Sequence, residues 1–248
     1  MAEISVVVLT RNEERNIGDC LETVQWADEL LVLDSFSNDA TEEIARSKGA
    51  EVRQQSFVNY SAQRNAALRL ATKEWVFFVD ADERVTPELA EEARRVVEQA
   101  GVDGWWVPRR NHIFGKWIRH AGWFPDHQLR LLRRGRARYH ERREVHESAQ
   151  LGGEAGHLQS PLIHYNYDSV REFRVRQGRY TDFEARMLFE SGHRARPHNF
   201  ILQPLRQFRW RYLTLQGYKD GWRGLLLSLL MAYYEMVRYR KLWRLQRA

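Results

Sequence analysis

The chain has 248 residues, of which 43% are hydrophobic and 12% aromatic, and its net charge of +6 comes from 39 Lys and Arg against 33 Asp and Glu. This composition indicates a folded globular protein with a sizeable core, and it excludes collagen-like and disordered chains. The single cysteine, Cys20, excludes a disulfide framework and a cysteine-rich zinc site and suits a reducing compartment. The first residues carry neither a basic segment nor a cleavage site, so we expect no signal peptide.

The first hundred residues alternate short apolar runs with helical patterns. The apolar runs predict strands over residues 4–9, 30–33 and 75–79, and a further short strand is expected near residues 51–53. The segments between and after them predict helices over residues 16–24, 39–49, 61–71 and 86–101. Such an alternation predicts an α/β fold with a mostly parallel sheet flanked by helices.

The pattern changes after residue 103. Residues 104–164 contain short aromatic strands with many Arg and His. From Ser169 onward the chain is helical and basic, and its longest apolar run, residues 225–234, is too short to span a bilayer. We therefore expect a domain over residues 1–168, with halves at 1–103 and 104–168, and a helical extension over residues 169–248.

Polar side chains follow three of the predicted strands. They are Thr10, Arg11, Asn12 and Glu13 after the first, Asp34 after the second, and Asp80-Ala81-Asp82-Glu83 after the fourth. Ligands of open parallel sheets bind at the carboxyl ends of the strands, so we expect these groups to converge on one crevice.

The carboxylates in these groups suit two kinds of ligand. Asp80 and Asp82, one residue apart at a strand end, can turn toward one divalent cation, and such oxygen ligands favour Mg²⁺ or Mn²⁺ held together with substrate phosphates. Asp34 can accept hydrogen bonds from ribose hydroxyls or a base N–H. The alternatives are a solvated acidic turn for the first pair and turn or helix-capping chemistry for residues 34–41.

These motifs, in this order, resemble those of the family 2 glycosyltransferases with the GT-A fold. The resemblance is carried by residues 4–12, Asp34-Ser-Phe-Ser-Asn-Asp, Gln63-Arg64-Asn65 and Asp80-Ala-Asp-Glu. Within that family, the lipopolysaccharide-core glucosyltransferase branch is similar in Phe124-Pro-Asp-His-Gln-Leu-Arg-Leu-Leu-Arg-Arg, Val145-His-Glu, Pro161-Leu-Ile-His-Tyr and the basic aromatic tail.

The resemblance implies a Rossmann-like nucleotide-sugar-binding half, an acceptor-binding half and a divalent cation, Mg²⁺ or Mn²⁺. Asp82 and His164 are the expected metal ligands. Arg130 and Arg133 could neutralise a departing nucleoside diphosphate. The expected nucleotide-sugar contacts are Thr10, Arg11, Asn12, Glu13, Asp34, Arg64, Asp80, Ala81, Asp82 and Arg130.

An inverting transfer needs a general base that deprotonates the attacking acceptor hydroxyl. The family places an Asp, commonly in a Glu-Asp pair, several tens of residues beyond the metal motif, and this sequence lacks that pair. Glu147 falls at the comparable position and is the favoured base, with Asp126 as the second candidate. Either could instead form an ion pair with a neighbouring Arg.

The positive charge is concentrated in the last third of the chain. Residues 171–248 hold 17 basic and 6 acidic side chains, a balance of +11, whereas residues 1–170 hold 22 and 27, a balance of −5. Aromatic and basic residues beside short apolar runs suit a helix in the interface of an anionic membrane. Packing on the catalytic domain and a homo-oligomer interface are the alternatives.

The sequence thus predicts a metal-dependent inverting glycosyltransferase that moves a hexose from a nucleotide sugar, with a UDP-sugar favoured, to a lipid-linked or glycan acceptor such as lipopolysaccharide core. We expect it in the cytoplasm, peripherally bound to the inner face of the cell membrane. The alternative is a nucleic-acid-binding protein that uses the basic tail, which would leave the strand-end groups unexplained. A nucleotide-dependent oxidoreductase is disfavoured, because no Gly-x-Gly-x-x-Gly follows the first strand.

Overall fold

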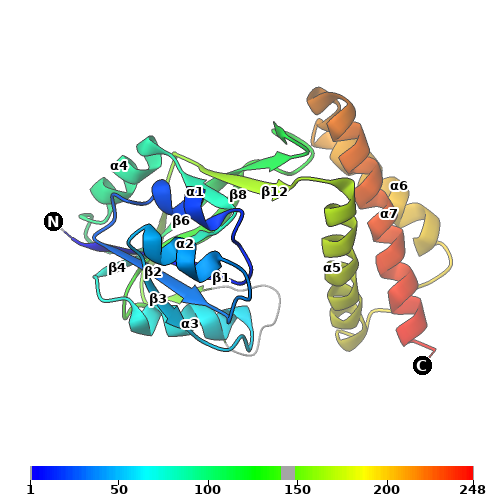
Figure 1. Ribbon diagram of the computed structural model, residues 1–248. Helices are drawn as coiled ribbons and strands as arrows, with labels where there is room; N and C mark the ends of the chain where they lie inside the picture. Colours follow the sequence, from blue (N-terminus) through cyan, green and yellow to red (C-terminus); the bar gives the residue numbers. More distant parts are fainter. Residues whose placement is uncertain (1, 141–148, 248) are drawn as a thin grey trace. The chain divides into compact units, whose positions relative to one another are not determined.

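The computed structural model describes residues 2–140 and 149–247. The chain divides into two compact units (Figure 1). The sheet unit comprises Met1–Arg109 and His127–His164, and the helical unit comprises Arg110–Asp126 and Tyr165–Ala248. Residues 110–126 are therefore grouped with residues 165–248.

The predicted parallel sheet is confirmed. Its strands run in the order β3-β2-β1-β4-β8-β6-β12-β5, and β7 and β11 pair with β6. The first four are parallel to one another, whereas β8 is antiparallel to β4 and β12 is antiparallel to β5. The strands of this sheet are β1 (Ile4–Thr10), β2 (Glu29–Asp34), β3 (Glu51–Gln54), β4 (Trp75–Asp80), β5 (Glu83–Val85), β6 (Val102–Ile113), β7 (Lys116–Trp117), β8 (Asp126–Arg133), β11 (Glu154–His157) and β12 (Leu162–Tyr167). A separate pair is formed by β9 (Ala137–Tyr139) and β10 (Ala149–Leu151).

The helices of the sheet unit form where the sequence predicts them. They are α1 (Ile17–Glu22), α2 (Thr41–Ser47), α3 (Tyr60–Leu70) and α4 (Pro87–Val96). Thr86 begins α4 as expected, because its side chain accepts a hydrogen bond from the backbone N–H of Leu89 at 3.2 Å. Asn59 starts α3 in the same way, through the backbone N–H of Ala62 at 2.8 Å.

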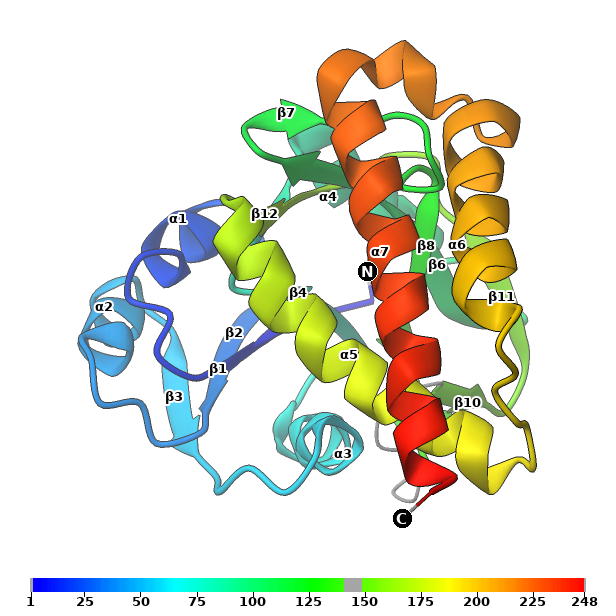
Figure 2. The same cartoon turned by 90° about the vertical axis from the view of Figure 1, so that its right-hand side faces the viewer.

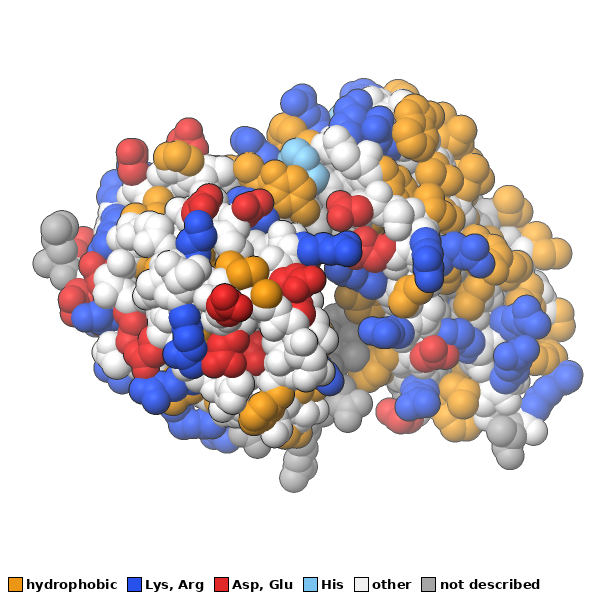
Figure 3. All heavy atoms as spheres, in the orientation of Figure 1, with side chains coloured by type: hydrophobic (Ala, Val, Ile, Leu, Met, Phe, Trp, Pro, Cys, Tyr) orange, Lys and Arg blue, Asp and Glu red, His pale blue; other side chains and the backbone are white. Residues whose placement is uncertain are grey.

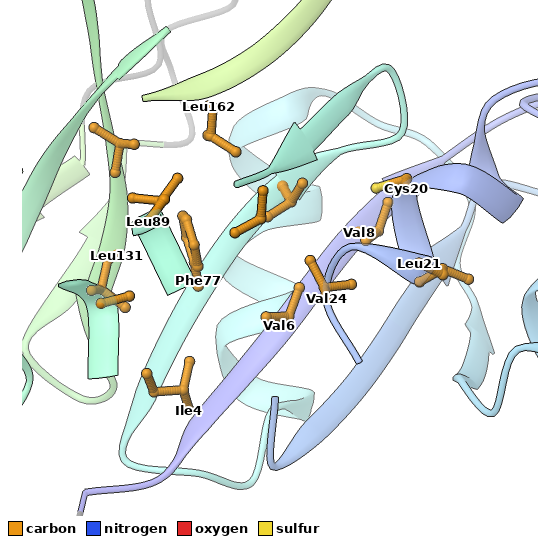
Figure 4. Close-up of a cluster of buried hydrophobic side chains, with 14 of the residues drawn as sticks. Ile4, Val6, Val8, Cys20, Leu21, Val24, Phe77, Leu89, Leu131 and Leu162 are labelled. Atoms are coloured by element: carbon orange, nitrogen blue, oxygen red, sulfur yellow. The ribbon is translucent and has the colours of Figure 1, made fainter. Parts of the chain in front are cut away.

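Both faces of the sheet are covered. On β1, Val6 and Val8 pack with α1 and α4 in one hydrophobic cluster, which also contains Cys20 and Phe77 (Figure 4). Val7, between them, points to a second cluster that includes Phe78 and residues of α3. This alternation explains why the first strand reads as a continuous apolar run, since both of its faces are buried.

Two strands differ from the sequence-based expectation. Residues 102–113 form one long strand, β6, in place of short strands, because it pairs with β12 on one edge and with β8 on the other. Glu83–Val85 form β5, a strand that the sequence did not predict, directly after a turn at Ala81 and Asp82, because Glu83 pairs with His164 on β12. In both cases the pairing partner is distant in sequence, so local patterns do not reveal it.

The helical unit is built mainly from three helices (Figure 2). These are α5 (Val170–Glu190), α6 (Asn199–Arg209) and α7 (Gly221–Leu245), with a π-helical turn at Trp210–Thr214 and a 3-10 turn at Gly217–Asp220 between the last two. Its core contains Ile113, Ile118, Phe173, Leu227 and Tyr234. Throughout the described ranges, 2–140 and 149–247, no helix combines the length and the apolar character needed to cross a membrane.

Gly224 allows α7 to approach the turn before it, and we expect Gly224→Ala to destabilise the helical unit by about 3 kcal/mol. A Cβ at this position would lie 1.9 Å from the backbone oxygen of Gly217, which cannot move without distorting the 3-10 turn. Gly178, in α5, is the matched control, because nothing lies within 4 Å of its added Cβ. Gly178→Ala should stabilise the protein by about 0.5–1 kcal/mol. Urea denaturation measures both, and equal effects would contradict this packing argument.

Candidate active site

The carboxyl ends of β1, β2 and β4 lie at one edge of the sheet. Thr10 is paired with Asp34 across β1 and β2, and Leu9 is paired with Asp80 across β1 and β4. The three strand-end groups singled out in the sequence therefore start at adjacent positions of the sheet. Arg11 and Asn12, in the turn after β1, are exposed there.

The turns after β1 and β2 are hydrogen-bonded to each other. The carboxylate of Asp34, which is fully buried, accepts from Thr10 Oγ1 at 3.1 Å and from the backbone N–H of Ser37 at 2.8 Å. The backbone N–H of Asn12 donates to Ser37 Oγ at 2.8 Å, and that of Glu13 donates to Thr41 Oγ1 at 2.8 Å. These bonds fix the shape of both turns beside Asp34.

A cluster of five charged side chains lies at the end of β4. Arg130 on β8 donates both of its terminal nitrogens to Asp80, and one of them also donates to Glu83 at 2.9 Å. Arg64 on α3 is 3.4 Å from Asp80, and Arg109 on β6 is 3.3 Å from Glu83. We call these side chains the Arg130 cluster; three guanidiniums against two carboxylates give it a formal charge of +1.

Burial of Arg130 and Glu83, whose side chains are 4% and 0% exposed, makes this cluster electrostatically strong. Desolvation alone would raise the pKa of Asp80, but the guanidiniums of Arg130 and Arg64 outweigh it and hold that pKa far below its usual range. Desolvation would likewise lower the pKa of Arg130, whereas Asp80 and Glu83 raise it well above its ordinary value. Asp80 is therefore ionised at neutral pH and already has two cationic partners within the protein.

Asp82 and His164 form a second pair at the same edge. His164 Nε2 lies 3.5 Å from Asp82 Oδ2, and the two side chains are 8% and 19% exposed. The antiparallel pairing of β5 with β12 brings His164 opposite Glu83, one residue after Asp82. A carboxylate and an imidazole at this separation fit two ligands of Mn²⁺ or Mg²⁺, ions that take their other ligands from phosphates and water.

Residues 2–140 and 149–247 contain no group of three or more His, Cys, Asp or Glu side chains that could hold a metal ion. Asp82 and His164 are therefore a pair without a third such ligand in the described part of the chain.

Ala81, between the two aspartates, is buried, and its carbonyl oxygen accepts a hydrogen bond from Arg84 at 2.9 Å. That bond holds the backbone from which Asp82 projects.

The two candidate bases are placed differently. Asp126 belongs to the helical unit and accepts a hydrogen bond from Asn111 Nδ2 at 3.2 Å. Glu147 lies outside the described residues. Arg133 does not join the Arg130 cluster: it pairs with Glu74 at 2.9 Å and lies opposite Trp75, at the other end of β4 from Asp80.

The sequence analysis included Glu83 in the strand-end motif but gave it no role, and it did not single out Arg109. Glu83 directly follows the aspartate motif, and its complete burial sets it apart from an ordinary turn residue. Arg109 has no local signal, because one Arg among many is identified only by the partner that the fold gives it.

Gln63, in the motif Gln63-Arg64-Asn65, has a structural contact. It is 2% exposed and donates to the backbone oxygen of Ser56 at 3.0 Å, which joins α3 to the chain after β3.

The sequence matches known proteins over most of its length. A family model described as Glycosyl transferase family 2 matches residues 5–173. The lipopolysaccharide core biosynthesis glycosyltransferase LpsC of Rhizobium meliloti is 27% identical over 97% of this chain and 92% of its own length. An uncharacterized glycosyltransferase of Rickettsia felis is 22% identical over 98% of this chain and 90% of its own length.

Two solved structures share the fold. The mannosyltransferase PcManGT of Pyrobaculum calidifontis, solved with GDP-Man and Mn²⁺, superposes with a TM-score of 0.61 at 15% identity, covering 97% of this chain and 87% of that one. Mannosyl-3-phosphoglycerate synthase of Rubrobacter xylanophilus gives 0.51 at 19% identity, covering 77% and 75%. At these identities the likeness shows a common GT-A architecture.

Proposed function

This chain belongs to glycosyl transferase family 2, and we propose that it transfers a hexose, with inversion, from a nucleotide sugar to a membrane-associated glycan or lipid-linked acceptor. Membership of the family makes it a nucleotide-sugar-dependent glycosyltransferase. The alternative of a nucleic-acid-binding protein leaves that membership and the strand-end groups without an explanation.

The observation that carries the proposal is the juxtaposition of the Arg130 cluster with the Asp82–His164 pair at the edge where β1, β2 and β4 end. A nucleotide sugar carries a diphosphate, and the leaving nucleoside diphosphate gains negative charge as the sugar departs. A cluster with a formal charge of +1 is suited to stabilise that charge. We propose Asp82 and His164 as the metal ligands; the metal, when bound, would neutralise the diphosphate as a Lewis acid.

The remaining proposed contacts belong to the nucleoside and to the turns that hold it. Asp34, Thr10 and the turn residues Arg11, Asn12 and Glu13 would bind the base and ribose, and Arg64, Asp80, Ala81 and Arg130 would line the diphosphate. Since Asp80 is already bonded to two guanidiniums, its role would be to orient them. The rigid, cross-bonded turns would then present preformed donors and acceptors to the nucleoside.

The transfer itself needs one proton acceptor. The acceptor hydroxyl oxygen attacks the anomeric carbon, the bond from that carbon to the diphosphate oxygen breaks, and the hydroxyl proton passes to a carboxylate base. We propose Glu147 as that base and Asp126 as the alternative. Inversion follows the family resemblance, and a UDP-sugar is the favoured donor.

The acceptor proposal rests on similarity and on charge. LpsC is described as a lipopolysaccharide core biosynthesis enzyme, and the balance of +11 in residues 171–248 suits an anionic membrane that presents a lipid-linked glycan. We therefore propose a cytoplasmic protein bound peripherally to the inner face of the membrane, with residues 1–168 catalytic and residues 169–248 as the extension.

The test is release of nucleoside diphosphate from a panel of UDP-, GDP-, ADP- and CMP-linked sugars, followed by mass spectrometry with Mn²⁺, Mg²⁺ or EDTA. We expect turnover of one UDP-hexose in the presence of metal and its loss in EDTA. Turnover that persists in EDTA would contradict the metal assignment, and release from none of these donors with a lipid-linked core acceptor present would contradict the proposal as a whole.

A further inference from the structure

Helix α6 leaves three of its large apolar side chains exposed, whereas its other apolar residues, Phe200, Pro204 and Phe208, are half-buried. Ile201, Leu202 and Leu205 are 64%, 57% and 61% exposed. Gln203 and Gln207, on the opposite side, are half-buried. An amphipathic surface helix normally buries its apolar stripe and exposes its amides, so this helix presents an apolar face that nothing in the described chain covers.

The same character continues beyond α6. In the π-helical turn, Trp210 and Leu213 are exposed, and α7, which packs against α6, exposes Trp222, Leu225 and Leu229 at helical spacing. Hydrophobic side chains gather over the helical unit in Figure 3, with Lys and Arg among them. We call these exposed residues of α6, the π-helical turn and the first half of α7 the apolar face.

The charges around the apolar face have one sign. Residues 199–233 contain five basic side chains and one acidic side chain. Arg206, Arg209 and Lys219 are exposed, whereas the acid, Asp220, is 5% exposed and accepts from the backbone N–H of His120 at 2.8 Å. The face is therefore apolar with a cationic border and presents no exposed carboxylate of its own.

We propose that the apolar face is a membrane-docking surface that inserts its Ile, Leu and Trp side chains into the interface of an anionic bilayer. Apolar insertion combined with basic residues at headgroup level is the arrangement by which peripheral helices bind such membranes. This surface would bring the enzyme to the membrane that carries its acceptor. The presence of an acceptor in that membrane rests on the proposed function, whereas the docking surface itself does not.

A bilayer fits this face better than a second copy of the chain does. A two-fold symmetric contact would bring the face against itself, and Arg206, Arg209 and Lys219 would then find no exposed carboxylate within the facing surface. An anionic headgroup layer supplies the missing charge, and its acyl region accepts the apolar side chains.

The experiment is co-sedimentation of the full-length protein with vesicles of phosphatidylcholine, with and without phosphatidylglycerol. We expect binding that requires phosphatidylglycerol and weakens with salt. The double substitution Ile201→Glu and Leu205→Glu should reduce the partition coefficient at least about 100-fold, since each leucine-sized side chain contributes tenfold or more on burial. The matched control is Val175→Glu with Met187→Glu on α5, which adds the same charge at exposed apolar sites and should keep most of the binding.

Three outcomes would overturn the proposal. If the α6 double variant bound vesicles as well as the wild type, the apolar face would not be the membrane-docking surface. If both double variants lost binding equally, the loss would come from the added negative charge and not from the apolar side chains of α6. Wild-type protein that is dimeric in solution and becomes monomeric in the α6 double variant would assign the face to a second copy. Because vesicle binding needs no sugar donor, nucleoside diphosphate release by the same samples is read separately and tests the proposed function.

Discussion

Replacing Asp82 with asparagine is expected to lower the rate of nucleoside diphosphate release by about 10²–10³-fold while leaving the fold intact. Asparagine keeps the shape of the side chain but removes the negative charge that faces His164 at 3.5 Å. The loss should be accompanied by a shift of half-saturation toward higher Mn²⁺ concentration, because a neutral amide is a weaker ligand than a carboxylate. Initial rates across a Mn²⁺ titration measure both quantities.

The matched control for this substitution is Asp182→Asn. Asp182 lies on α5, 62% of its side chain is exposed, and its partner is Lys241 at 2.7 Å. The substitution removes one negative charge, as Asp82→Asn does, but at a position far from the strand-end motifs in sequence. The rate and the Mn²⁺ dependence should therefore both stay at the wild-type level. If the Asp82→Asn enzyme kept the wild-type Mn²⁺ dependence, Asp82 would not be a metal ligand, even if the rate of nucleoside diphosphate release fell.

Replacing Arg130 with methionine is expected to lower the free energy of unfolding by about 3–5 kcal/mol. The side chain of Arg130 is 4% exposed and lies between Asp80 and Glu83, and the side chain of Glu83 is fully buried. Methionine fills the space but leaves the carboxylate of Glu83 with Arg109 as its remaining charge partner in this cluster. Urea denaturation at neutral pH measures the loss.

Arg133 provides the control on the same strand. Its side chain is 40% exposed; it pairs with Glu74, which is 46% exposed, and lies 3.8 Å from Asp103, and ion pairs this accessible or this long contribute about 1 kcal/mol or less. Arg133→Met should therefore be nearly neutral. Adding Glu83→Gln to Arg130→Met should restore part of the stability, since it removes a buried carboxylate that has lost one of its two guanidinium partners. If Arg130→Met and Arg133→Met lowered the free energy of unfolding by similar amounts, burial of the Arg130 cluster would contribute little to stability.

The same cluster predicts a pH dependence of stability. The pKa of Asp80 is lower in the folded protein than in the unfolded chain, where it is near 3.8. A carboxyl group of this kind stabilises the fold above its unfolded pKa, and the contribution is lost as the pH falls below about 4. Wild-type stability should therefore drop on acidification through that range, and the drop should be smaller in Arg130→Met.

The sequence predicted the local structure of residues 1–103 well. Continuous apolar runs marked β1, β2 and β4 because both faces of these strands are buried, and Thr86 with Pro87 marked the start of α4. The polar residues at the strand ends were identified for the same reason: they interrupt apolar runs at the point where a parallel sheet binds ligands.

What the sequence could not predict is pairing over long separations. The pairing of Glu83 was not predicted because its partner strand lies about eighty positions later, and Arg109 was indistinguishable from its neighbours. The basic aromatic tail was recognised, but the sequence did not predict which of its side chains are buried and which are exposed. The exposure of Ile201 and Leu205 depends on how α6 packs against α7. Local pattern gives the elements, and tertiary packing decides which of their faces meet solvent.

The separations within the site also bear on how the chain matures during synthesis. Asp80 obtains the second of its two guanidinium partners 50 residues later, from Arg130, and Asn65 on α3 exchanges two hydrogen bonds with the backbone of Tyr139, 74 residues later. A nascent chain that has released only residues 1–103 therefore contains Arg64 but lacks Arg130 and the backbone to which Asn65 bonds. We therefore expect the Arg130 cluster to form during synthesis only after β8 has been translated, since Arg130 lies on that strand.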